Sequence, residues 1–366
     1  PVFLGGIRMG NSRARKILGW VTIGFMGLLL LGCKPGRPEF ALPKIKMITG
    51  ENLHSVVAFN AEEALASGNY GVIYNTSTGG KTTKDWQLLA SGVGNTLLCE
   101  ATFLDRDIGW VVGTKGTIIH TTDGGKKWMK QESGTGKNLF AVSFADAQNG
   151  WVVGEYGTLL HTADGGKNWE SQAKEIDKML NGVCFIDARN GWIAGEFGTI
   201  LHTTDGGEHW KEQRCKDIET VTDMFSYDWK PMPALYEIYF ADEDKGWIVG
   251  MDGIILKTEN GGKLWRKLET DFDTPLYSIA IKGKKGWIVG KEGYYLLSED
   301  GGETWEVKDD VIKTRFWLKD VAFSDENNGW VVGARGTVAR STDGGKSWEL
   351  ISGMSYDMPE YGLADF

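Results

Sequence analysis

Residues 150–169 read GWVVGEYGTLLHTADGGKNW, and this stretch returns along the chain with small changes. Residues 109–128 read GWVVGTKGTIIHTTDGGKKW, and residues 191–210 read GWIAGEFGTILHTTDGGEHW. Weaker copies lie at residues 246–265, 286–305 and 329–348, and a worn first copy ends at Trp86. The chain therefore contains seven copies of one unit.

The spacing of the copies indicates the fold. The tryptophans that close them are 42, 41, 41, 55, 40 and 43 residues apart, a period that is typical of propeller blades. In the third copy we expect strands at Leu139–Ala145, Gly150–Gly154, Thr158–Thr162 and Asn168–Gln172, because each is short, β-branched or aromatic, and bounded by turn residues. One four-stranded sheet cannot cover both of its faces, so neighbouring sheets must stack in a closed ring. The sequence predicts an all-β, seven-bladed propeller of four-stranded antiparallel blades.

Tryptophan marks fixed positions in the repeat. Of 16 tryptophans, six stand in the Gly-Trp pairs of the repeat copies and seven close a copy. Large aromatic side chains at such positions fill the wedge-shaped gaps between radiating sheets. We interpret them as core residues rather than as a row that stacks on a ligand.

The repeat defines one domain at residues 53–352, with an insertion at residues 211–234 and a tail at residues 353–366. Residues 34–52 contain three prolines and read as a tether. Its end, residues 44–48, alternates charged and apolar side chains, so it either belongs to the tether or adds an outer strand to the last blade and closes the ring.

The net charge is negative. The formal charge of the chain is −9, and residues 34–366 contain 36 basic and 49 acidic residues. An acidic body argues against a nucleic-acid partner.

The first 33 residues have the pattern of an export signal. Met9 is a better candidate than Pro1 for the biological start, and Arg13, Arg15 and Lys16 precede an apolar run at residues 17–31. The run is short for a membrane span, and its end, Leu30-Leu31-Gly32-Cys33, resembles the lipobox of bacterial lipoproteins. That resemblance implies cleavage before Cys33 and a lipid on its sulfur, with an uncleaved anchor or plain secretion as alternatives. We expect an extracytoplasmic, lipid-anchored protein on the periplasmic side or at the outer membrane.

Three further cysteines follow Cys33. Cys99 and Cys184 fall on predicted first strands, and Cys215 lies in the insertion. An odd number outside the cytoplasm allows one disulfide, for which Cys184 and Cys215 are the most reachable pair. Since CxxC and CxxH spacings are absent from the sequence, we expect neither a metal site nor a cofactor.

Six of the copies also carry a turn signature, with an asparagine in place of the aspartate in one of them. Thr162, Asp164, Gly166 and Trp169 match the Asp-box of bacterial neuraminidases, Ser/Thr-x-Asp-x-Gly-x-x-Trp. An aspartate here accepts backbone N–H groups of its own turn, and an asparagine does the same. We therefore interpret these side chains as structural rather than catalytic: Asp123, Asp164, Asp205, Asn260, Asp300 and Asp343.

Three histidines share one repeat position on the third strands, His120, His161 and His202. Equivalent strands of adjacent blades lie roughly 15 Å or more apart if strands are spaced by about 4.8 Å. Zinc needs its ligands within about 2 Å of the ion. We expect blade-face residues, because the same position holds Lys257, Leu297 and Arg340 in other copies.

The loops of each blade alternate between the two ends of the ring. Asp-box turns share one end with the first-to-second loops, and the second-to-third turns share the other with the blade-to-blade connections. We call this second end the turn face; its turns are Asn69-Tyr70, Thr114-Lys115, Glu155-Tyr156, Glu196-Phe197, Met251-Asp252, Lys291-Glu292 and Ala334-Arg335. The insertion opens there and contains exposed aromatic candidates, so it either binds a partner or covers the channel as a lid. We predict partner binding through Tyr156, Phe197, Tyr227, Trp229, Arg335 and Arg340.

Seven GWxVGxxGTIxxTxDGGxxW units after an export signal resemble the photosystem II stability/assembly factor family, over residues 53–352. That resemblance implies a seven-bladed propeller, lipid-anchored in cyanobacteria, that holds newly made reaction-centre subunits and assembly intermediates without chemistry. The family's working surface is rich in arginine, and Arg335, Arg340 and Arg214 are the residues that would correspond to it. We expect a monomer that binds a membrane-protein subunit or assembly intermediate.

An enzyme is the alternative. Sialidases share the Asp-box, but their Phe/Tyr-Arg-Ile-Pro segment is missing from this sequence and its arginines are scattered. Paired carboxylates in the channel, as in other glycosidases, would instead make the protein a glycan-binding protein or a glycoside hydrolase. We expect no catalytic residues.

Overall fold

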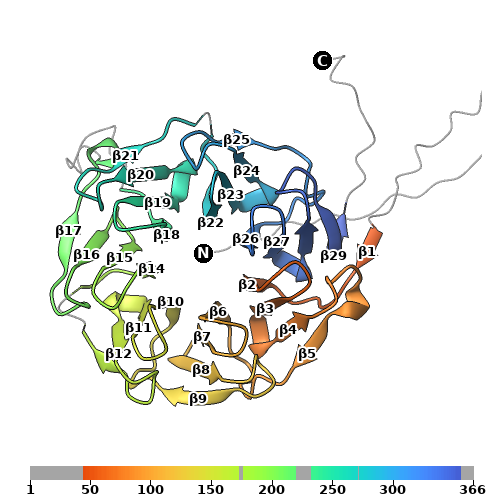
Figure 1. Ribbon diagram of the computed structural model, residues 1–366, viewed down its shortest axis with the longest axis horizontal. Helices are drawn as coiled ribbons and strands as arrows, with labels where there is room; N and C mark the ends of the chain where they lie inside the picture. The colour runs from red at the N-terminus through yellow and green to blue at the C-terminus, as the bar shows by residue number, and fades with distance from the viewer. Residues whose placement is uncertain (1–43, 173–175, 220–231, 271, 356–366) are drawn as a thin grey trace, which may run out of the picture. The chain divides into compact units, whose positions relative to one another are not determined.

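The computed structural model describes residues 44–172, 176–219, 232–270 and 272–355. In this part of the chain seven antiparallel sheets stand around one axis, each with its first strand innermost (Figure 1). The prediction of a seven-bladed propeller with four-stranded blades is confirmed. The helical segments of these residues are three-residue 3-10 turns, and none has the length and apolarity that a bilayer-spanning helix needs. The predicted signal with Cys33, most of the tether and the C-terminal tail lie outside the described residues.

The blades follow the order of the chain. Blade 1 consists of β2 (Leu53–Ala58), β3 (Ala64–Gly68), β4 (Ile73–Thr76) and β5 (Gln87–Leu89). Blade 2 consists of β6 (Leu98–Phe103), β7 (Gly109–Gly113), β8 (Thr117–Thr121) and β9 (Met129–Glu132). Blade 3 consists of β10 (Leu139–Phe144), β11 (Gly150–Gly154), β12 (Leu159–Thr162) and β13 (Glu170–Ser171). Blades 4 and 5 consist of β14 (Leu180–Phe185), β15 (Gly191–Gly195), β16 (Ile200–Thr203) and β17 (Lys211–Gln213); and β18 (Leu235–Phe240), β19 (Lys245–Gly250), β20 (Ile255–Glu259) and β21 (Arg266–Lys267). Blades 6 and 7 consist of β22 (Leu276–Lys282), β23 (Lys285–Gly290), β24 (Tyr295–Ser298) and β25 (Glu306–Val307); and β26 (Leu318–Phe323), β27 (Gly329–Gly333), β28 (Val338–Ser341) and β29 (Glu349–Ser355). The 3-10 turns are η1 (Asn69–Gly71), η2 (Thr83–Asp85), η3 (Glu155–Gly157), η4 (Lys216–Ile218), η5 (Met251–Gly253), η6 (Lys291–Gly293) and η7 (Ala334–Gly336).

The innermost strand of each blade has an irregularity directly after its first residue. In blade 2, Leu98 pairs with Gly113 and Glu100 pairs with Val112, so Cys99 is the extra residue of a β-bulge. The same shift follows the first leucine of all seven inner strands. The leucine itself is fully buried in every blade, which fixes the position of the bulge: Leu53, Leu98, Leu139, Leu180, Leu235, Leu276 and Leu318.

The tryptophan of each Gly-Trp pair lies buried between neighbouring blades. The ring of Trp151 is stacked between His161 of its own blade, at 4.8 Å between centroids, and Phe185 of the next blade, at 3.5 Å. Its indole N–H donates to the carbonyl of Gly206 in the next blade's Asp-box turn. Trp110 and Trp192 are stacked in the same way. The histidines are therefore packing residues, and each sandwich joins two blades.

The Asp-box turns stabilise themselves. Asp164 accepts the backbone N–H of Asn168 at 2.9 Å and the hydroxyl of Thr162 at 2.9 Å. The N–H of Asn168 is the main cause that lowers the pKa of Asp164 to about 2. Asn260 accepts the N–H of Leu264 at 2.9 Å through its amide oxygen, so the fifth box keeps its shape without a carboxylate.

Side-chain packing between blades 7 and 1 closes the ring. Leu53 and Val56 of β2 belong to one buried cluster with Trp330 and Val332 of β27. All four repeat strands of blade 7 come from the last copy, and β1 (Lys44–Lys46) pairs with β29 as a fifth, outermost strand (Figure 1). The N-terminal strand is thus an addition to a complete blade.

The three described cysteines are free thiols, which corrects the suggested disulfide between Cys184 and Cys215. Cys184 lies on the innermost strand of blade 4, whereas Cys215 follows its outermost strand, β17. Three strand spacings of about 4.8 Å separate them, more than a disulfide can span. Burial raises the pKa of the Cys99 and Cys184 thiols to about 12, so both stay protonated.

Candidate binding face

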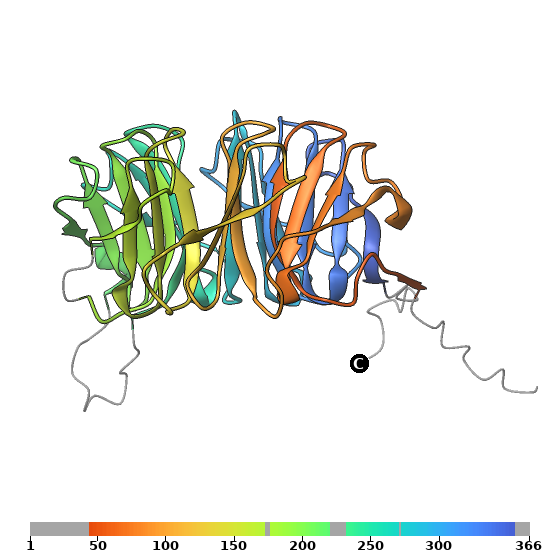
Figure 2. The ribbon, with the colours of Figure 1, turned by 90° about the horizontal axis from the view of Figure 1, so that it is seen from below.

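The two ends of the ring differ in their loops, as the alternation of a meander predicts (Figure 2). On the turn face, Gly157 donates its N–H to the carbonyl of Lys178 in the following blade-to-blade connection, at 2.6 Å. At the other end, Gly165 of an Asp-box turn donates to the carbonyl of Gln148 in a first-to-second loop, at 2.9 Å. Backbone contacts therefore hold the turn face together between blades.

Each turn of the turn face contains a side-chain-bearing residue in the left-handed backbone region. For a residue other than glycine this conformation costs roughly 1–2 kcal/mol. It recurs at the second turn position of every blade, with φ between 51° and 60°: Tyr70, Lys115, Tyr156, Phe197, Asp252, Glu292 and Arg335. The following residue is always a glycine, as at Gly157, where an added Cβ would lie 1.7 Å from the carbonyl oxygen of Ile176. The fold therefore holds seven strained side chains at the tips of one face.

Three of the predicted contact residues lie exposed at these tips. Tyr156 and Phe197 are 56% and 49% exposed, although both are large and apolar. The ammonium of Lys137 lies 5.7 Å from the centre of the Tyr156 ring. The guanidinium of Arg335 lies 4.8 Å from the centre of the Phe316 ring. Tyr227 and Trp229 of the insertion lie outside the described residues.

Arg340 does not belong to the turn face, and its assignment to the contact set was wrong. It is 7% exposed and lies over the ring of Trp330 at 5.5 Å. Its guanidinium donates to the carbonyl of Ala61 at 2.6 Å and lies 3.6 Å from Glu62, in the β2–β3 loop at the Asp-box end. Blade 1 has Ala58 where blades 2 to 5 and 7 have a phenylalanine, and the side chain of Arg340 helps to bury the Trp330 ring.

The central channel opens on the turn face in a cavity of 330 Å³, which we call the channel mouth. Leu97 and Met179, which line it, belong to the blade-to-blade connections of this end. The extra residue of each inner-strand bulge also lines it, one from every blade: His54, Cys99, Phe140, Asn181, Tyr236, Tyr277 and Lys319. The channel mouth is thus a largely apolar hollow with a few charged groups, the usual composition of a binding pocket.

Three carboxylates occupy the next repeat position, in blades 2, 5 and 7, and also line the channel mouth. Each accepts a backbone N–H of a neighbouring blade: Glu100 from Val142 at 2.9 Å, Glu237 from Ile279 at 3.0 Å, and Asp320 from Val56 at 2.8 Å. Asp320 also accepts the hydroxyl of Ser278 at 2.7 Å. These acids therefore connect neighbouring blades at the channel mouth.

The electrostatics of the channel mouth follow from its burial. Burial raises the pKa of Glu100 well above its usual range, and the nearby Glu237 raises it further. Burial and then Asp320 raise the pKa of Glu237 to about 8. Burial also lowers the pKa of His54, so its imidazole is mostly neutral at pH 7. Further negative charge is disfavoured here, and a cation is favoured.

Sequence reasoning missed the channel carboxylates. A signal existed, because the residue two places after the buried leucine is Ser55, Glu100, Ala141, Gly182, Glu237, Ser278 and Asp320 in successive copies. Three acids at one repeat position converge on the axis of a ring. The bulge obscured this signal, since it breaks the alternation by which strand faces are read.

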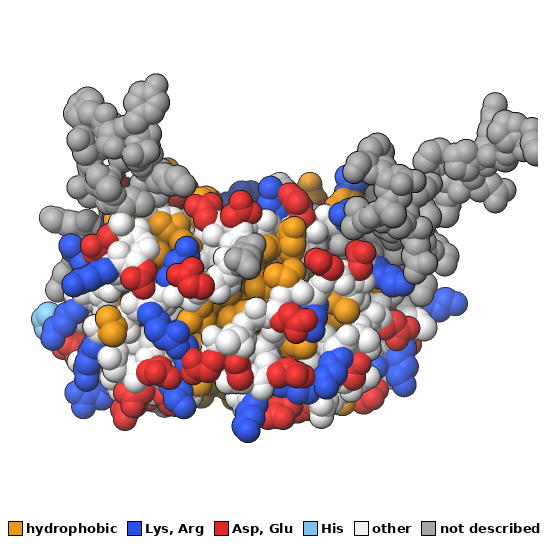
Figure 3. Space-filling model, turned by 90° about the horizontal axis from the view of Figure 1, so that it is seen from above, with side chains coloured by type: hydrophobic (Ala, Val, Ile, Leu, Met, Phe, Trp, Pro, Cys, Tyr) orange, Lys and Arg blue, Asp and Glu red, His pale blue; other side chains and the backbone are white. Residues whose placement is uncertain are grey.

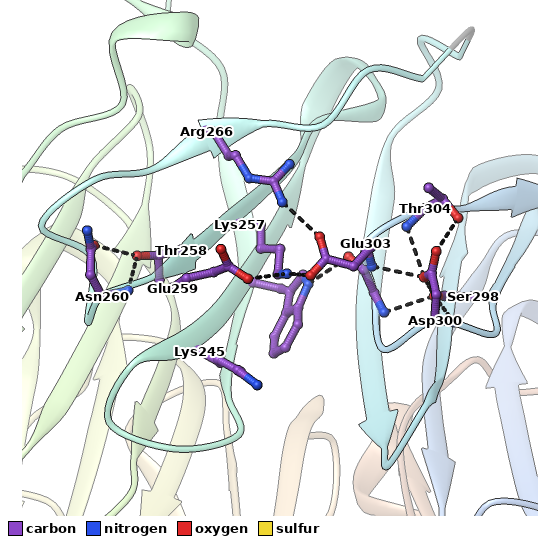
Figure 4. Close-up of polar contacts among 12 residues, drawn as sticks. Lys245, Lys257, Thr258, Glu259, Asn260, Arg266, Ser298, Asp300, Glu303 and Thr304 are labelled. Carbon is purple, nitrogen blue, oxygen red and sulfur yellow. Dashed lines mark hydrogen bonds and ion pairs between the residues drawn. The ribbon is translucent and has the colours of Figure 1, made fainter.

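A second hollow of 540 Å³ lies between blades 5 and 6, lined by Trp247, Ile281 and Lys257 among others. Ile281 stands where other blades place a phenylalanine, and the buried ammonium of Lys257 lies 5.6 Å from the Trp247 ring centre. Figure 4 shows this ammonium between Glu303 and Glu259, 3.1 Å from the latter, with Arg266 on the other oxygen of Glu303 at 2.8 Å. Since its charges are balanced, we interpret the cluster as structural.

Among the described residues, Asp205, Glu208 and His209 lie close enough together to share an ion. His209 Nδ1 lies 2.9 Å from Asp205 Oδ2, and Asp205 accepts two further bonds within its own Asp-box turn. We interpret this exposed set as turn contacts.

In a side view of the ring, acidic and basic side chains are interspersed around apolar ones (Figure 3).

The chain matches a family model described as photosynthesis system II assembly factor YCF48, at residues 79–182, 169–230, 220–309 and 306–364. No protein of curated function matches it in sequence.

Several solved structures share the fold. A structure of YCF48 bound to D1 peptide is 20% identical, with a TM-score of 0.64 over 81% of this chain and 95% of that one. YCF48 from Cyanidioschyzon merolae is 18% identical, with a TM-score of 0.62 over 82% and 99%. The GH74 enzyme of Niastella koreensis is 12% identical, with a TM-score of 0.63 over 84% of this chain and 55% of that one. At such identities these likenesses establish the fold alone.

Proposed function

This chain belongs to the family of the photosynthesis system II assembly factor YCF48, and on that premise we propose that it is a non-catalytic scaffold that holds a segment of a membrane-protein subunit during assembly. The segment lies on the turn face, across the channel mouth. The solved YCF48 with a D1 peptide supports a peptide-like partner. The identity of the subunit is left open by this proposal.

The observation that carries the proposal is the set of strained turns around the channel mouth. Glycine would adopt the left-handed conformation at no steric cost, yet all seven blades present a side chain there. Strain of this kind persists where a side chain at that position is useful. Exposed aromatic tips beside an apolar hollow form the type of surface that binds a peptide.

We also propose that the protein is tethered outside the cytoplasm through a lipid on Cys33. The export pattern of residues 1–33 supports this. The carbonyl of Thr49, between β1 and β2, lies beside Gly336 of a turn-face turn, so the tether joins the ring near this end. A membrane subunit and the turn face would then meet at one membrane surface.

Replacing two exposed aromatics tests the turn face. The full-length variant Tyr156→Ala/Phe197→Ala should fold normally and capture membrane subunits from detergent-solubilised host membranes at least tenfold less well than the wild type. The matched control is Met129→Ala/Leu264→Ala, whose side chains are 56% and 65% exposed on β9 and in an Asp-box turn. Quantitative mass spectrometry of the bound subunits measures the difference, and equal recovery by both variants would refute the proposed site.

The alternative is a glycan-binding protein or glycoside hydrolase. The channel carboxylates are the candidates for its acid–base pair that line the channel mouth, but each already accepts a backbone N–H. Incubation with xyloglucan and sialoside substrates should show no turnover. Hydrolysis that is lost in Glu237→Gln would establish the enzyme instead.

A further inference from the structure

The channel mouth has a chemistry that selects one kind of guest. We propose that it takes the ammonium or guanidinium group of a lysine or arginine side chain from the segment bound on the turn face. This inference rests on the proposed function, because it supposes a peptide partner. The partner must then present a lysine or an arginine at the axis of the ring.

The walls of the channel mouth are aromatic. The ring centres of Tyr236 and Tyr277 lie 5.6 Å apart, with the ring planes tilted by 53°, and Phe140 lines the same cavity. An aromatic face attracts a cation within about 6 Å of its centre, and the attraction grows where water is excluded. The long aliphatic stem of lysine or arginine also fits an apolar hollow, because it buries its methylene groups while its charged end reaches deeper.

The charged groups of the cavity complement a cation. Glu100, Glu237 and Asp320 reach it from three blades, and Lys319 is the one basic side chain among its lining residues. An incoming ammonium would find carboxylate oxygens beside aromatic faces, the two partners that stabilise a desolvated cation. Burial keeps Glu100 and Glu237 largely protonated, and an incoming cation favours their ionisation, whereas an incoming carboxylate opposes it.

The chain already contains an example of this interaction. The ammonium of Lys319 lies 5.3 Å from the centre of the Tyr277 ring, inside the same cavity. Its neighbour in sequence, Asp320, points into the cavity as well. One resident ammonium thus lies on one side of the aromatic wall, and the three acidic side chains offer further partners for a second cation.

The turns around the cavity favour the same partner. Three adjacent blades, 3 to 5, present an acidic side chain at the turn face, Glu155, Glu196 and Asp252, whereas Glu292 of blade 6 is paired with Lys291 of its own turn at 3.2 Å. Glu196 covers the entrance directly, since it accepts the N–H of Met179, a residue that lines the cavity, at 3.1 Å. An acidic arc on one side of the entrance steers a basic segment toward it.

Short capped peptides test the inference on the intact protein. The series is Gly-Gly-X-Gly-Gly, in which X is lysine, arginine, norleucine, glutamine or glutamate, and calorimetry gives each dissociation constant. We expect lysine and arginine to bind at least tenfold more tightly than norleucine, and glutamate not to bind. Equal binding of lysine and norleucine, or a preference for glutamate through Lys319, would overturn the inference whatever the variants do.

Two variants locate the cation. Glu100→Gln and Glu237→Gln retain an oxygen that can accept the backbone N–H of the neighbouring blade, so the ring should remain intact. Each should weaken the lysine peptide about tenfold, or about 1.4 kcal/mol, and leave the norleucine peptide unchanged. The control Glu243→Gln, an exposed residue of the Asp-box end, should bind like the wild type. Unchanged lysine binding in both channel variants would refute this site.

The outcome separates the inference from the proposed function. If Tyr156→Ala/Phe197→Ala loses capture of membrane subunits while the peptide series shows no preference for a cation, the turn face stands and the cationic guest does not. If neither assay gives its expected result, both fall.

Affinity for the lysine peptide should also rise between pH 6 and 8.5, because burial raises the pKa of Glu237 to about 8 and the ionised form binds the cation. The other titratable or charged groups that face this site are His54, Cys99, Glu100, Tyr236, Tyr277, Lys319 and Asp320.

Discussion

A single repeat position explains several side chains that differ in chemistry. The third-strand residue opposite the Gly-Trp tryptophan is histidine in blades 2 to 4, Lys257 in blade 5, Leu297 in blade 6 and Arg340 in blade 7. Where the next blade offers a phenylalanine, the tryptophan is stacked at 3.5 to 3.6 Å. Where it offers only Ile281 or Ala58, a cationic side chain lies over the ring instead. The size of one neighbour thus decides which residue fits the position.

The Lys257 cluster gives a prediction at this scale. Glu303→Ala should lower the free energy of unfolding by about 1–2 kcal/mol, because it leaves the buried ammonium of Lys257 with Glu259 as its remaining partner. The loss should be smaller than for a fully buried ion pair, because Glu303 is half-exposed to water. Lys257→Leu, which copies blade 6, should change it by less than about 1 kcal/mol, because it removes the buried charge.

Urea unfolding measures these differences, and the double variant supplies the decisive comparison. In the Lys257→Leu background, Glu303→Ala should cost almost nothing, which isolates the coupling between the two residues. The exposed pair of Lys346 and Glu299 is the control, and Glu299→Ala should cost less than about 0.5 kcal/mol. Additive losses in the double variant would contradict the assignment of Lys257 and Glu303 as partners.

At the scale of the blade, strand pattern and turn chemistry were predictable. Gly150–Gly154 is a strand as expected, and the Asp-box turns follow from residues whose hydrogen bonds are local. What depends on contacts between copies was not predictable. Arg340 was assigned to the wrong end because its environment depends on Ala58, more than two hundred residues away in sequence. The channel acids were missed because a bulge decides where they point.

The strained turns give a prediction at the same scale. Tyr156→Gly should raise the free energy of unfolding by about 0.5–1 kcal/mol, because relief of the left-handed strain exceeds the added entropy of the unfolded chain. It should at the same time reduce capture of the membrane subunit, a trade of stability against function. Glu292→Gly, at the same turn position of blade 6, should gain similar stability. A destabilised Tyr156→Gly would show that the aromatic ring packs rather than binds.

The whole ring depends on contacts that cross from blade to blade. Blade 7 is complete without β1, and its contact with blade 1 through Trp330 and Leu53 closes the circle. The seven inner strands meet at the axis, where side chains of one blade accept backbone N–H groups of another. The stability of the channel is therefore a property of the closed molecule and not of one blade, and the ionisation of Glu100 and Glu237 depends on acids of other blades.

This coupling predicts how stability changes with pH. Burial raises the pKa of Glu237 from its ordinary value of 4.5 to about 8, so the folded ring keeps a proton that the unfolded chain has lost across this window. The free energy of unfolding should accordingly fall as pH rises from 6 to 9, with a slope below the limit of about 1.4 kcal/mol per pH unit for one proton, because water reaches the channel mouth. Glu237→Gln should flatten the slope, whereas Glu243→Gln should leave it unchanged. Chemical denaturation at several pH values measures it, and stability that increases over this range in the wild type would refute a protonated carboxyl in the channel.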